Sequence, residues 1–399
     1  MFFSAQSEHS TPTSEVGANI QHSTFNIQLS TLSTPLPLNP ALASLPVYQP
    51  GRPIEDVARE LGLDPGSIIK LASNENPLGP SRLAMAALRG ALASLNLYPD
   101  GNAFYLKQKL AAKLNVTPAN LILGNGSNEV LEMVGHALLA PGAEAIVSQY
   151  CFAVYPIVTA LFGAKLVTVP ARNYGHDLDA MLAAITPATR VVFVANPNNP
   201  TGTEVRNEDL ARFVAAIPPN VLLVMDEAYI EFLEKPLDLL PEIRSGTRPN
   251  LILTRTFSKI YGLAGLRLGY GIGDPDFIAA LEKIRQPFNI NAAAQIAALA
   301  ALDDQKHIDQ TRKINTRGLK LYAKTFRRMK REFIPSSANF ILVRVGDGQR
   351  VFQELQKLGV ITRPMGGYQL PEWIRISIGT PKENARCLEG LARVPAPAA

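Results

Sequence analysis

Seven short, almost uninterrupted apolar runs limit what this chain can fold into. They are "LILG" (121–124), "AIVSQY" (145–150), "KLVTVP" (165–170), "RVVFVANP" (190–197), "VLLVMDEAY" (221–229), "LILTRTFSK" (251–259) and "LRLGYGI" (266–272). Runs that are apolar at successive positions are typical of strands covered on both faces. Helical patterns separate several of them; Val130, Val134 and Leu138, for example, share one face of a helix. We therefore predict an α/β fold with a mostly parallel sheet.

A second structural unit is expected from about residue 290 onward. It contains a long polar helix over about 305–332, a strand over 339–345, a helix over 348–359 and a strand over 373–379. The 45 residues at the start are rich in Ser, Thr, Asn, Gln and Pro and contain no Lys or Arg, which is typical of a flexible tail. We predict a tail (1–45), an N-terminal arm (46–75), a large domain (76–290) and a small C-terminal domain (291–399).

Composition and charge exclude several classes of protein. The hydrophobic share of 47% and the charged share of 18% are ordinary for a globular chain of 399 residues, and the net charge of +5 is modest. The basic run at 327–331 is more typical of a solvated helix face than of a nucleic-acid site. No apolar stretch is long enough to span a membrane. Cys151 and Cys387 show no metal-ligand spacing, so we expect no metal and a reducing, cytoplasmic setting.

Polar residues gather at the ends of four predicted strands. The segment 124–128 ("GNGSN") follows the first run, and "NPNNPTG" (196–202) follows the fourth. Asp226 and Tyr229 close the fifth run, and Lys259 closes the sixth. Ligands of open α/β sheets bind outside the carboxyl ends of the strands. These groups should therefore converge on one crevice.

One end of this crevice suits a phosphate group. "GNGSN" precedes a helix, whose N-terminal N–H groups and dipole attract anions. The segment lacks the Lys-Ser/Thr of a P-loop and the third glycine of a dinucleotide fingerprint. Ser258 could add a hydroxyl and Arg267 a bidentate cation to the same phosphate. Alone, the pair of glycines could equally form a tight turn.

The other polar groups suit an aromatic ring that carries a cation and an oxygen. Asp226 ends a buried strand, where a carboxylate normally needs a cationic partner. Asn199 and Tyr229 could hydrogen-bond a phenolate-like oxygen. Lys259 supplies an amine that can form a Schiff base. Together with the phosphate cradle, these groups describe pyridoxal 5'-phosphate.

The motifs "NPNNPTG", "DEAY" and "SKIYGLAGLRLGY", in this order, resemble those of fold-type I aminotransferases. More narrowly, the chain resembles the histidinol-phosphate aminotransferases of the class II pyridoxal-phosphate-dependent family. The supporting stretches are "VYQPGRPIEDVARELG" (47–62), "LASNENPLGPS" (71–81), "YPDGNAFYLKQKLA" (98–111), "SSANFILV" (336–343) and "WIRISIGTPKEN" (373–384). The resemblance covers the chain from about residue 45 and implies a large, cofactor-binding domain with a seven-stranded sheet, followed by a smaller C-terminal α/β domain.

The resemblance also implies roles for individual residues. Lys259 would form the Schiff base and move the proton, Asp226 would hold the pyridine nitrogen protonated, and Tyr229 and Asn199 would bind the ring oxygen. The residues expected around the phosphate are Gly126, Ser127, Asn128, Thr256, Ser258 and Arg267. Phe152 would stack on the ring, although a lone aromatic is equally often a core residue. Tyr98 would reach the cofactor phosphate of a neighbouring subunit, which implies a homodimer with shared active sites.

Substrate contacts follow from the same resemblance. Arg375 would hold the phosphate of histidinol phosphate and, in the other half-reaction, a carboxylate of 2-oxoglutarate or glutamate. Arg363 and, from the other subunit, Tyr48 would complete the phosphate site, although they could instead be a surface ion-pair partner and a packing residue. Asn74 and Asn76 could line the site or only shape a turn.

The implied reaction converts L-histidinol phosphate and 2-oxoglutarate to imidazole-acetol phosphate and L-glutamate, a step of histidine biosynthesis. Two alternatives stay open: an aromatic amino-acid aminotransferase and, less well supported, a threonine-phosphate decarboxylase. A DNA-binding regulator is disfavoured because the tail has no basic residues and no helix-turn-helix pattern.

Overall fold

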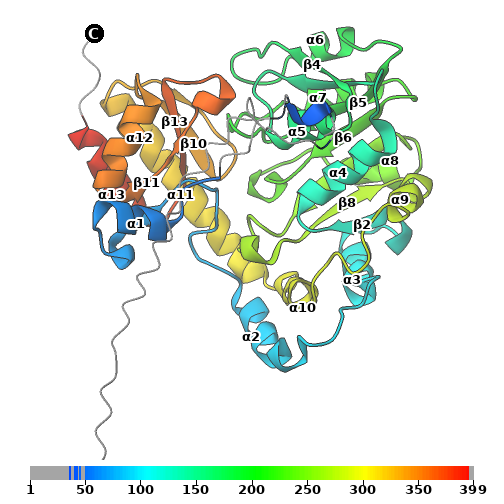
Figure 1. Ribbon diagram of the computed structural model, residues 1–399, viewed down its shortest axis with the longest axis horizontal. Coiled ribbons are helices and arrows are strands. Elements are labelled where there is room, and N and C mark those ends of the chain that lie inside the picture. Colours follow the sequence, from blue (N-terminus) through cyan, green and yellow to red (C-terminus); the bar gives the residue numbers. More distant parts are fainter. Residues whose placement is uncertain (1–35, 37–39, 44, 46–49, 395–399) are drawn as a thin grey trace, which may run out of the picture.

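The computed structural model describes residues 36, 40–43, 45 and 50–394. Two α/β parts lie side by side, one built on a seven-stranded sheet and one on a four-stranded sheet (Figure 1). Most of the predicted tail (1–45), and Tyr48 of the predicted arm, lie outside the described residues. None of the described helices is both long and apolar enough to cross a membrane.

The larger sheet contains all seven predicted strands. In spatial order they are β2 (Leu121–Gly124), β8 (Gly269–Gly273), β7 (Leu251–Thr256), β6 (Leu222–Asp226), β5 (Thr189–Ala195), β3 (Glu144–Ser148) and β4 (Lys165–Val169). Strand β8 is antiparallel to β2 and β7, and every other neighbouring pair is parallel. The prediction of a mostly parallel α/β sheet is confirmed.

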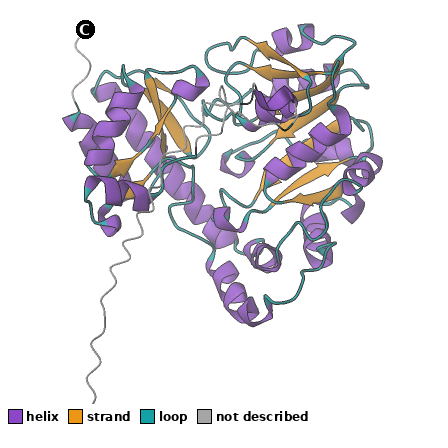
Figure 2. Ribbon diagram, in the orientation of Figure 1, coloured by secondary structure: helices purple, strands orange, loops and turns teal. Residues whose placement is uncertain are grey.

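Two separate hydrophobic cores explain why the strands are apolar at every position. Along β5, Val191 and Phe193 lie in one core, whereas Val192 and Val194 lie in the other. The first core is covered by α4 (Ser127–Leu138), α5 (Val154–Leu161) and α9 (Pro275–Glu282). The second is covered by α2 (Arg82–Ala91), α3 (Phe104–Leu114), α6 (Leu178–Ala183), α7 (Asn207–Ala216), α8 (Leu240–Arg244) and α10 (Ala292–Ala301). Figure 2 shows helices on both sides of this sheet.

Three strands stop or start three residues inside their apolar runs. The strand in the fifth run ends at Asp226, and the strand in the sixth run ends at Thr256. Tyr229 and Lys259 therefore lie on the loops that follow these strands. The seventh run begins its strand only at Gly269. Arg267 has a φ of 55°, a left-handed conformation that cannot continue a strand. These three loops carry the polar groups to the edge of the sheet.

The smaller sheet has the order β12 (Arg363–Pro364), β13 (Trp373–Ser377), β10 (Phe340–Arg344) and β9 (Phe333–Ile334), all antiparallel. It packs with α11 (Gln305–Arg328), α12 (Gly348–Lys357) and α13 (Pro381–Arg393). A two-stranded parallel ladder of β1 (Ile69–Lys70) and β11 (Val360–Ile361) brings α1 (Ile54–Leu61) to the same part. Short 3-10 helices complete the described elements: η2 (Pro40–Ala43), η3 (Pro65–Ser67), η4 (Leu92–Ser94), η5 (Pro118–Asn120), η6 (Ile230–Phe232), η7 (Ala264–Leu266) and η8 (Gly366–Tyr368).

Helix α11 connects the two parts (Figure 1). Ile308 near its start belongs to a core of the large sheet, and Tyr322 and Phe326 near its end belong to the core of the small sheet. The predicted domain boundary near residue 290 stays a prediction; α10, just after it, packs its buried alanines into the core of the large sheet.

Candidate active site

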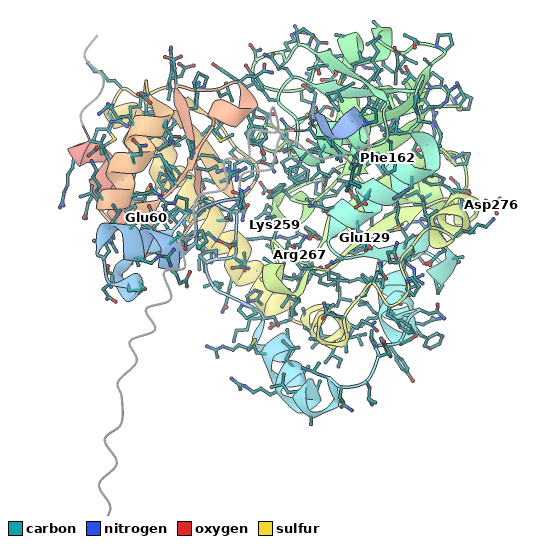
Figure 3. The ribbon with its side chains drawn as sticks, viewed as in Figure 1. Glu60, Glu129, Phe162, Lys259, Arg267 and Asp276 are labelled. Carbon is teal, nitrogen blue, oxygen red and sulfur yellow. The ribbon has the colours of Figure 1, made fainter. Side chains whose placement is uncertain are left out.

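A cavity of about 280 Å³ lies at the carboxyl ends of the parallel strands, next to the small sheet. Its lining includes thirteen of the residues that sequence reasoning singled out: Gly126, Ser127, Asn128, Phe152, Asn199, Asp226, Tyr229, Thr256, Ser258, Lys259, Arg267, Arg363 and Arg375. Figure 3 shows Lys259 and Arg267 near one another between the two parts of the molecule. The predicted convergence of the strand ends on one crevice is therefore what the fold produces.

Lys259 reaches the cavity from the loop after β7. Its Nζ donates a hydrogen bond to the carbonyl of Ser73 at 3.3 Å and lies 5.8 Å from the centre of the Tyr229 ring. Burial lowers the pKa of this amine to about 8, and the nearby Arg375 acts in the same direction. A substantial share of the amine is then neutral near pH 8, as a nucleophilic lysine requires.

The N-terminus of α4 lines one part of the cavity. Gly126 is the N-cap, with a φ of 81°, and no side chain caps the helix there. A Cβ at Gly126 would lie 2.4 Å from Nη2 of Arg267, so the guanidinium packs directly over this glycine. Nη1 of Arg267 is 3.5 Å from Oγ of Ser258. Backbone N–H groups, a cation and a hydroxyl thus face one small region, which suits a phosphate.

Thr256, which was expected beside the phosphate, forms hydrogen bonds to nearby backbone groups. Its hydroxyl accepts a hydrogen bond from the backbone N–H of Ser258 at 3.0 Å and donates one to the carbonyl of Leu268 at 3.3 Å. The side chain therefore shapes the loop that carries Ser258 and Lys259. A direct contact with phosphate stays a prediction.

Asp226 is a buried carboxylate at the end of β6. It accepts hydrogen bonds from the Tyr155 hydroxyl at 2.7 Å and from the backbone N–H of Ala228 at 3.1 Å. Burial raises its pKa, against the lowering effect of these two donors. In the part of the chain that the structure describes, no Lys, Arg or His forms an ion pair with it. A protonated ring nitrogen would supply the missing cation.

Arg375 and Arg363 come from neighbouring strands of the small sheet and stand directly opposite each other in the β12–β13 register. Nη1 of Arg375 donates to Oδ1 of Asn199 at 2.6 Å, Nη2 donates to the Ala72 carbonyl at 3.0 Å, and the guanidinium lies 5.1 Å from the centre of the Phe340 ring. Like charges directly opposite in a sheet are destabilising. An anion in the cavity would relieve this repulsion.

The charge of the cavity points to the same kind of ligand. Four of the lining residues that the structure describes are cations (Lys259, Arg267, Arg363 and Arg375), and two are carboxylates (Glu75 and Asp226). The cationic groups come from two parts of the fold: Arg267 lies over Gly126 at the N-terminus of α4, and the arginine pair lies on the small sheet. Two separate sets of cations can hold two anionic groups, and Lys259 and Asp226 line the same cavity.

One predicted contact, Tyr98, is absent from the described lining of this cavity, and a second, Tyr48, cannot be placed. Tyr98 lies on the surface with 83% of its area exposed, and its ring stacks on Phe288 with the ring centres 4.8 Å apart. Tyr48 lies outside the described residues. Both were expected to act on a neighbouring subunit, and that expectation stays a prediction.

The structure also adds to the residues expected from the sequence. Asn74, for which a place in the site and a turn were both left open, lines the cavity together with Ser73 and Glu75 and donates a hydrogen bond to the Tyr229 hydroxyl at 2.9 Å. Tyr155 holds Asp226. The stretch "SNENP" (73–77) was a weak signal for the first group, whereas a tyrosine in an apolar helix gives no signal beyond a core position.

The donor set fits pyridoxal phosphate. The helix N-terminus with Arg267 suits the phosphate, the buried carboxylate of Asp226 suits the pyridine nitrogen, and Lys259 in the same cavity is an amine of lowered pKa. Phe152 lines the same cavity, where its ring could lie against the cofactor. Its stacking role stays a prediction.

Comparison with known proteins agrees with this assignment. The family model "Aminotransferase class I and II" matches residues 66–391. A histidinol-phosphate aminotransferase of Akkermansia muciniphila is 52% identical over 357 residues, which cover 89% of this chain and 98% of that protein. Another, from Ralstonia nicotianae, is 52% identical over 350 residues, covering 86% and 93% of the two chains.

Solved structures give the same result. The histidinol-phosphate aminotransferase of Sinorhizobium meliloti, crystallised in complex with pyridoxal-5'-phosphate, has a TM-score of 0.81 and 31% identity, covering 91% of this chain and 98% of that one. An aspartate aminotransferase of Thermus thermophilus has a TM-score of 0.75 and 25% identity, covering 89% and 99%. The chain therefore belongs to the class I and II aminotransferases and, among them, to the histidinol-phosphate aminotransferases.

Proposed function

We propose that this enzyme transfers the amino group of L-histidinol phosphate to 2-oxoglutarate, giving imidazole-acetol phosphate and L-glutamate, as a step of histidine biosynthesis. The observation that carries the proposal is the cross-strand pair of Arg363 and Arg375, both of which line the cavity. A dianionic phosphate can accept hydrogen bonds from both guanidinium groups at once. The histidinol-phosphate aminotransferases that are about 50% identical to this chain support the same substrate.

Pyridoxal phosphate is the cofactor, and when bound it supplies an electron sink for the bond broken at the substrate carbon. Lys259 would hold or release a proton at Nζ, which its pKa of about 8 permits near neutral pH. Asp226 would keep the pyridine nitrogen protonated, and Tyr229 and Asn199 would fix the ring oxygen. Phe152 would limit the tilt of the ring.

The phosphate end would hold the cofactor throughout the reaction. Ser127 and Asn128 on the first turn of α4, together with Ser258 and Arg267, would contact its phosphate. Holding the cofactor at a point remote from the reacting carbon leaves Lys259 free to move its proton.

One arginine site would serve both substrates in turn. In the first half-reaction Arg375 and Arg363 would hold the phosphate of histidinol phosphate, and in the second Arg375 would hold a carboxylate of 2-oxoglutarate. A planar guanidinium fork matches both anions. Arg375 is already fixed by Asn199 and the Ala72 carbonyl, so little side-chain freedom is lost on binding. The kinetics should be ping-pong, because the amino group rests on the cofactor between the two halves.

The test is glutamate formation by the purified enzyme with 2-oxoglutarate and a series of amino donors. A kcat/KM for histidinol phosphate at least about 100-fold above that for phenylalanine would correspond to about 2.7 kcal/mol of discrimination by the phosphate. Equal values for the two donors would instead indicate an aromatic amino-acid aminotransferase. Release of CO₂ from threonine phosphate without glutamate formation would indicate a decarboxylase.

We also propose that two copies of the chain form a homodimer with shared active sites. A group of large apolar side chains around α2 and α3 is exposed: Leu78, Leu83, Leu92, Leu95, Leu97, Tyr98, Phe104 and Tyr105, with Phe288 beside them. Exposed apolar groups of this extent are typical of protein interfaces. Tyr98 would reach the phosphate of the partner's cofactor.

A subunit-mixing experiment tests this arrangement. A Lys259→Ala subunit has no catalytic amine, and a Tyr98→Ala subunit lacks the donated tyrosine. In a mixed dimer, one site combines the intact Lys259 of one subunit with the intact Tyr98 of the other. Refolding the two variants together should therefore give more activity than either alone. No gain on mixing, with dimers confirmed by light scattering, would refute a shared site.

A cytoplasmic location is part of the proposal. Cys151 and Cys387 are both free, which fits a reducing compartment. Cell fractionation with an antibody to the enzyme would test it; recovery in the membrane or secreted fraction would contradict it.

A further inference from the structure

Asn74 lies at the centre of a buried hydrogen-bond network that joins the cavity to the small sheet. Its side chain is 2% exposed, and its φ of 56° places the backbone in the left-handed region that asparagine tolerates. Nδ2 donates to the Tyr229 hydroxyl at 2.9 Å, and Oδ1 accepts from the Ser377 hydroxyl at 3.0 Å. The backbone N–H of Asn74 donates to the same Ser377 oxygen at 2.8 Å, and its carbonyl accepts from Asn339 at 3.0 Å.

The network fixes which way the amide of Asn74 points. Ser377 accepts the backbone N–H of Asn74, so its own proton needs an acceptor, and Oδ1 of Asn74 provides it. If the amide were reversed, the Ser377 proton would have no acceptor among the described residues, in a site where Ser377 is 3% exposed. An unpaired buried donor is costly. The NH₂ group of Asn74 therefore faces Tyr229.

This orientation decides the direction of the Tyr229 hydroxyl. Because its oxygen accepts from Asn74, its proton must point elsewhere, and no described residue accepts it. Tyr229 lines the cavity, so the proton is available to an acceptor there. Burial raises the pKa of Tyr229 to about 12, which keeps the hydroxyl protonated at physiological pH.

The neighbours of Asn74 show that this segment serves the site as a unit. The Ala72 carbonyl accepts from Arg375, and the Ser73 carbonyl accepts from Lys259. Ser377 stands two positions after Arg375 on β13, so their side chains leave the same face of that strand. Residues 72–74 thus contact the anion-binding arginine, the amine and the hydroxyl.

We propose that Asn74 is a positioning residue that makes Tyr229 a hydrogen-bond donor to the ring oxygen of the bound cofactor, and that Ser377 holds Asn74 in this orientation. The inference rests on the role of Tyr229 given under the proposed function. The donated hydrogen bond stabilises negative charge on the ring oxygen. Without this hydrogen bond, the ring oxygen carries more negative charge and binds the proton next to it more tightly. That proton is then lost only at a higher pH.

The test is a pH titration of the visible absorption band of the holoenzyme, without any substrate. Asn74→Gly removes the side chain and keeps the left-handed backbone accessible. We expect the pKa of the band to rise by about one unit. A shift of this size corresponds in free energy to the loss of about one hydrogen bond to a charged group. Asn74→Asp places an acceptor against Tyr229 and should also raise the pKa, whereas Ser377→Ala, which frees the amide to turn, should raise it less. Asn115→Gly is the matched control, because Asn115, the C-cap of α3, is exposed and has a φ of 52°, and the substitution should cause no shift.

A double-mutant cycle separates action through Tyr229 from a general loss of structure. Tyr229→Phe should raise the pKa of the band by itself, and adding Asn74→Gly should then have no further effect. An unchanged pKa in a folded Asn74→Gly enzyme, or a full additional shift in the Tyr229→Phe background, would overturn the inference. If histidinol phosphate proved not to be the substrate while the Asn74 shift was observed, only the proposed substrate would fall.

Discussion

The contact between Gly126 and Arg267 gives the sharpest prediction for cofactor binding. In Gly126→Ala the new Cβ would lie 2.4 Å from Nη2 and 3.2 Å from Cζ of Arg267. The guanidinium is the end of a flexible side chain, so it should move away while the backbone stays in place. The substitution should therefore displace the cation from the phosphate position.

The magnitude follows from two separate costs. A non-glycine residue at a φ of 81° carries backbone strain of about 1 to 3 kcal/mol, which lowers the free energy of unfolding. Loss of one hydrogen bond to a charged group costs about 1.5 to 3 kcal/mol. The loss of this hydrogen bond should weaken cofactor binding, so that the dissociation constant of pyridoxal phosphate is about 10- to 150-fold higher.

The assay is equilibrium titration of the apoenzyme, first with pyridoxal phosphate and then with pyridoxal, which has no phosphate. Gly126→Ala should weaken binding of pyridoxal phosphate and leave binding of pyridoxal nearly unchanged. Gly142→Ala is the matched control, because Gly142 has a φ of 92° and nothing within 4 Å of its added Cβ. It should lower the free energy of unfolding without changing affinity for either compound.

Two results would refute this reasoning. Equal weakening of pyridoxal phosphate and pyridoxal by Gly126→Ala would show that the substitution disturbs the whole cavity. Unchanged affinity for pyridoxal phosphate would show that Arg267 does not hold the phosphate.

Three further predictions concern the amine and the substrate. Lys259→Ala should retain bound cofactor while turnover falls by about 100-fold or more, measured as glutamate formation; turnover equal to the wild type would remove the amine from the mechanism. The rate at which the apoenzyme captures pyridoxal phosphate should rise with pH through about 8, because the amine of Lys259 is protonated below its lowered pKa and neutral above it; a midpoint near the ordinary value of 10.5 would contradict this. Arg363→Ala should raise KM for histidinol phosphate by about 10- to 150-fold and leave KM for phenylalanine nearly unchanged, whereas equal losses would argue against a phosphate site.

The sequence predicts the large sheet well because both faces of its strands are buried. Successive residues of β5 enter two different cores, and this is what makes the run apolar without alternation. The ends of the strands are less predictable. Apolar and aromatic residues continue past Asp226 and Thr256, and only the backbone conformation shows that the strands have ended there.

The active-site residues on strand ends are predictable for a topological reason. Parallel strands bring their carboxyl ends to one edge, so Asp226 and Lys259 meet although they are far apart in the chain. The contacts of Asn74 have no such rule. Asn74 reaches Tyr229 across 155 residues and Ser377 across 303, through the docking of the small sheet against the large one. Residue spacing alone gives no sign of these contacts.

The pairing of Arg363 with Arg375 is a further feature that only the structure reveals. Strand β12 contains two residues, too few for any hydrophobic pattern, yet its register places the two arginines directly opposite each other. The resemblance to known aminotransferases pointed to both residues, and the register adds a physical reason to expect an anionic substrate beside them.

The most direct test of the account is a single-turnover titration of the purified holoenzyme, followed by its visible absorption. Histidinol phosphate alone should abolish the absorption band of the bound cofactor, and 2-oxoglutarate should restore it with one glutamate formed per site. That result would establish cofactor, donor and acceptor together. A band that stays unchanged with histidinol phosphate but disappears with phenylalanine would contradict the proposed substrate, and a protein that shows no band even after pyridoxal phosphate is added would contradict the account as a whole.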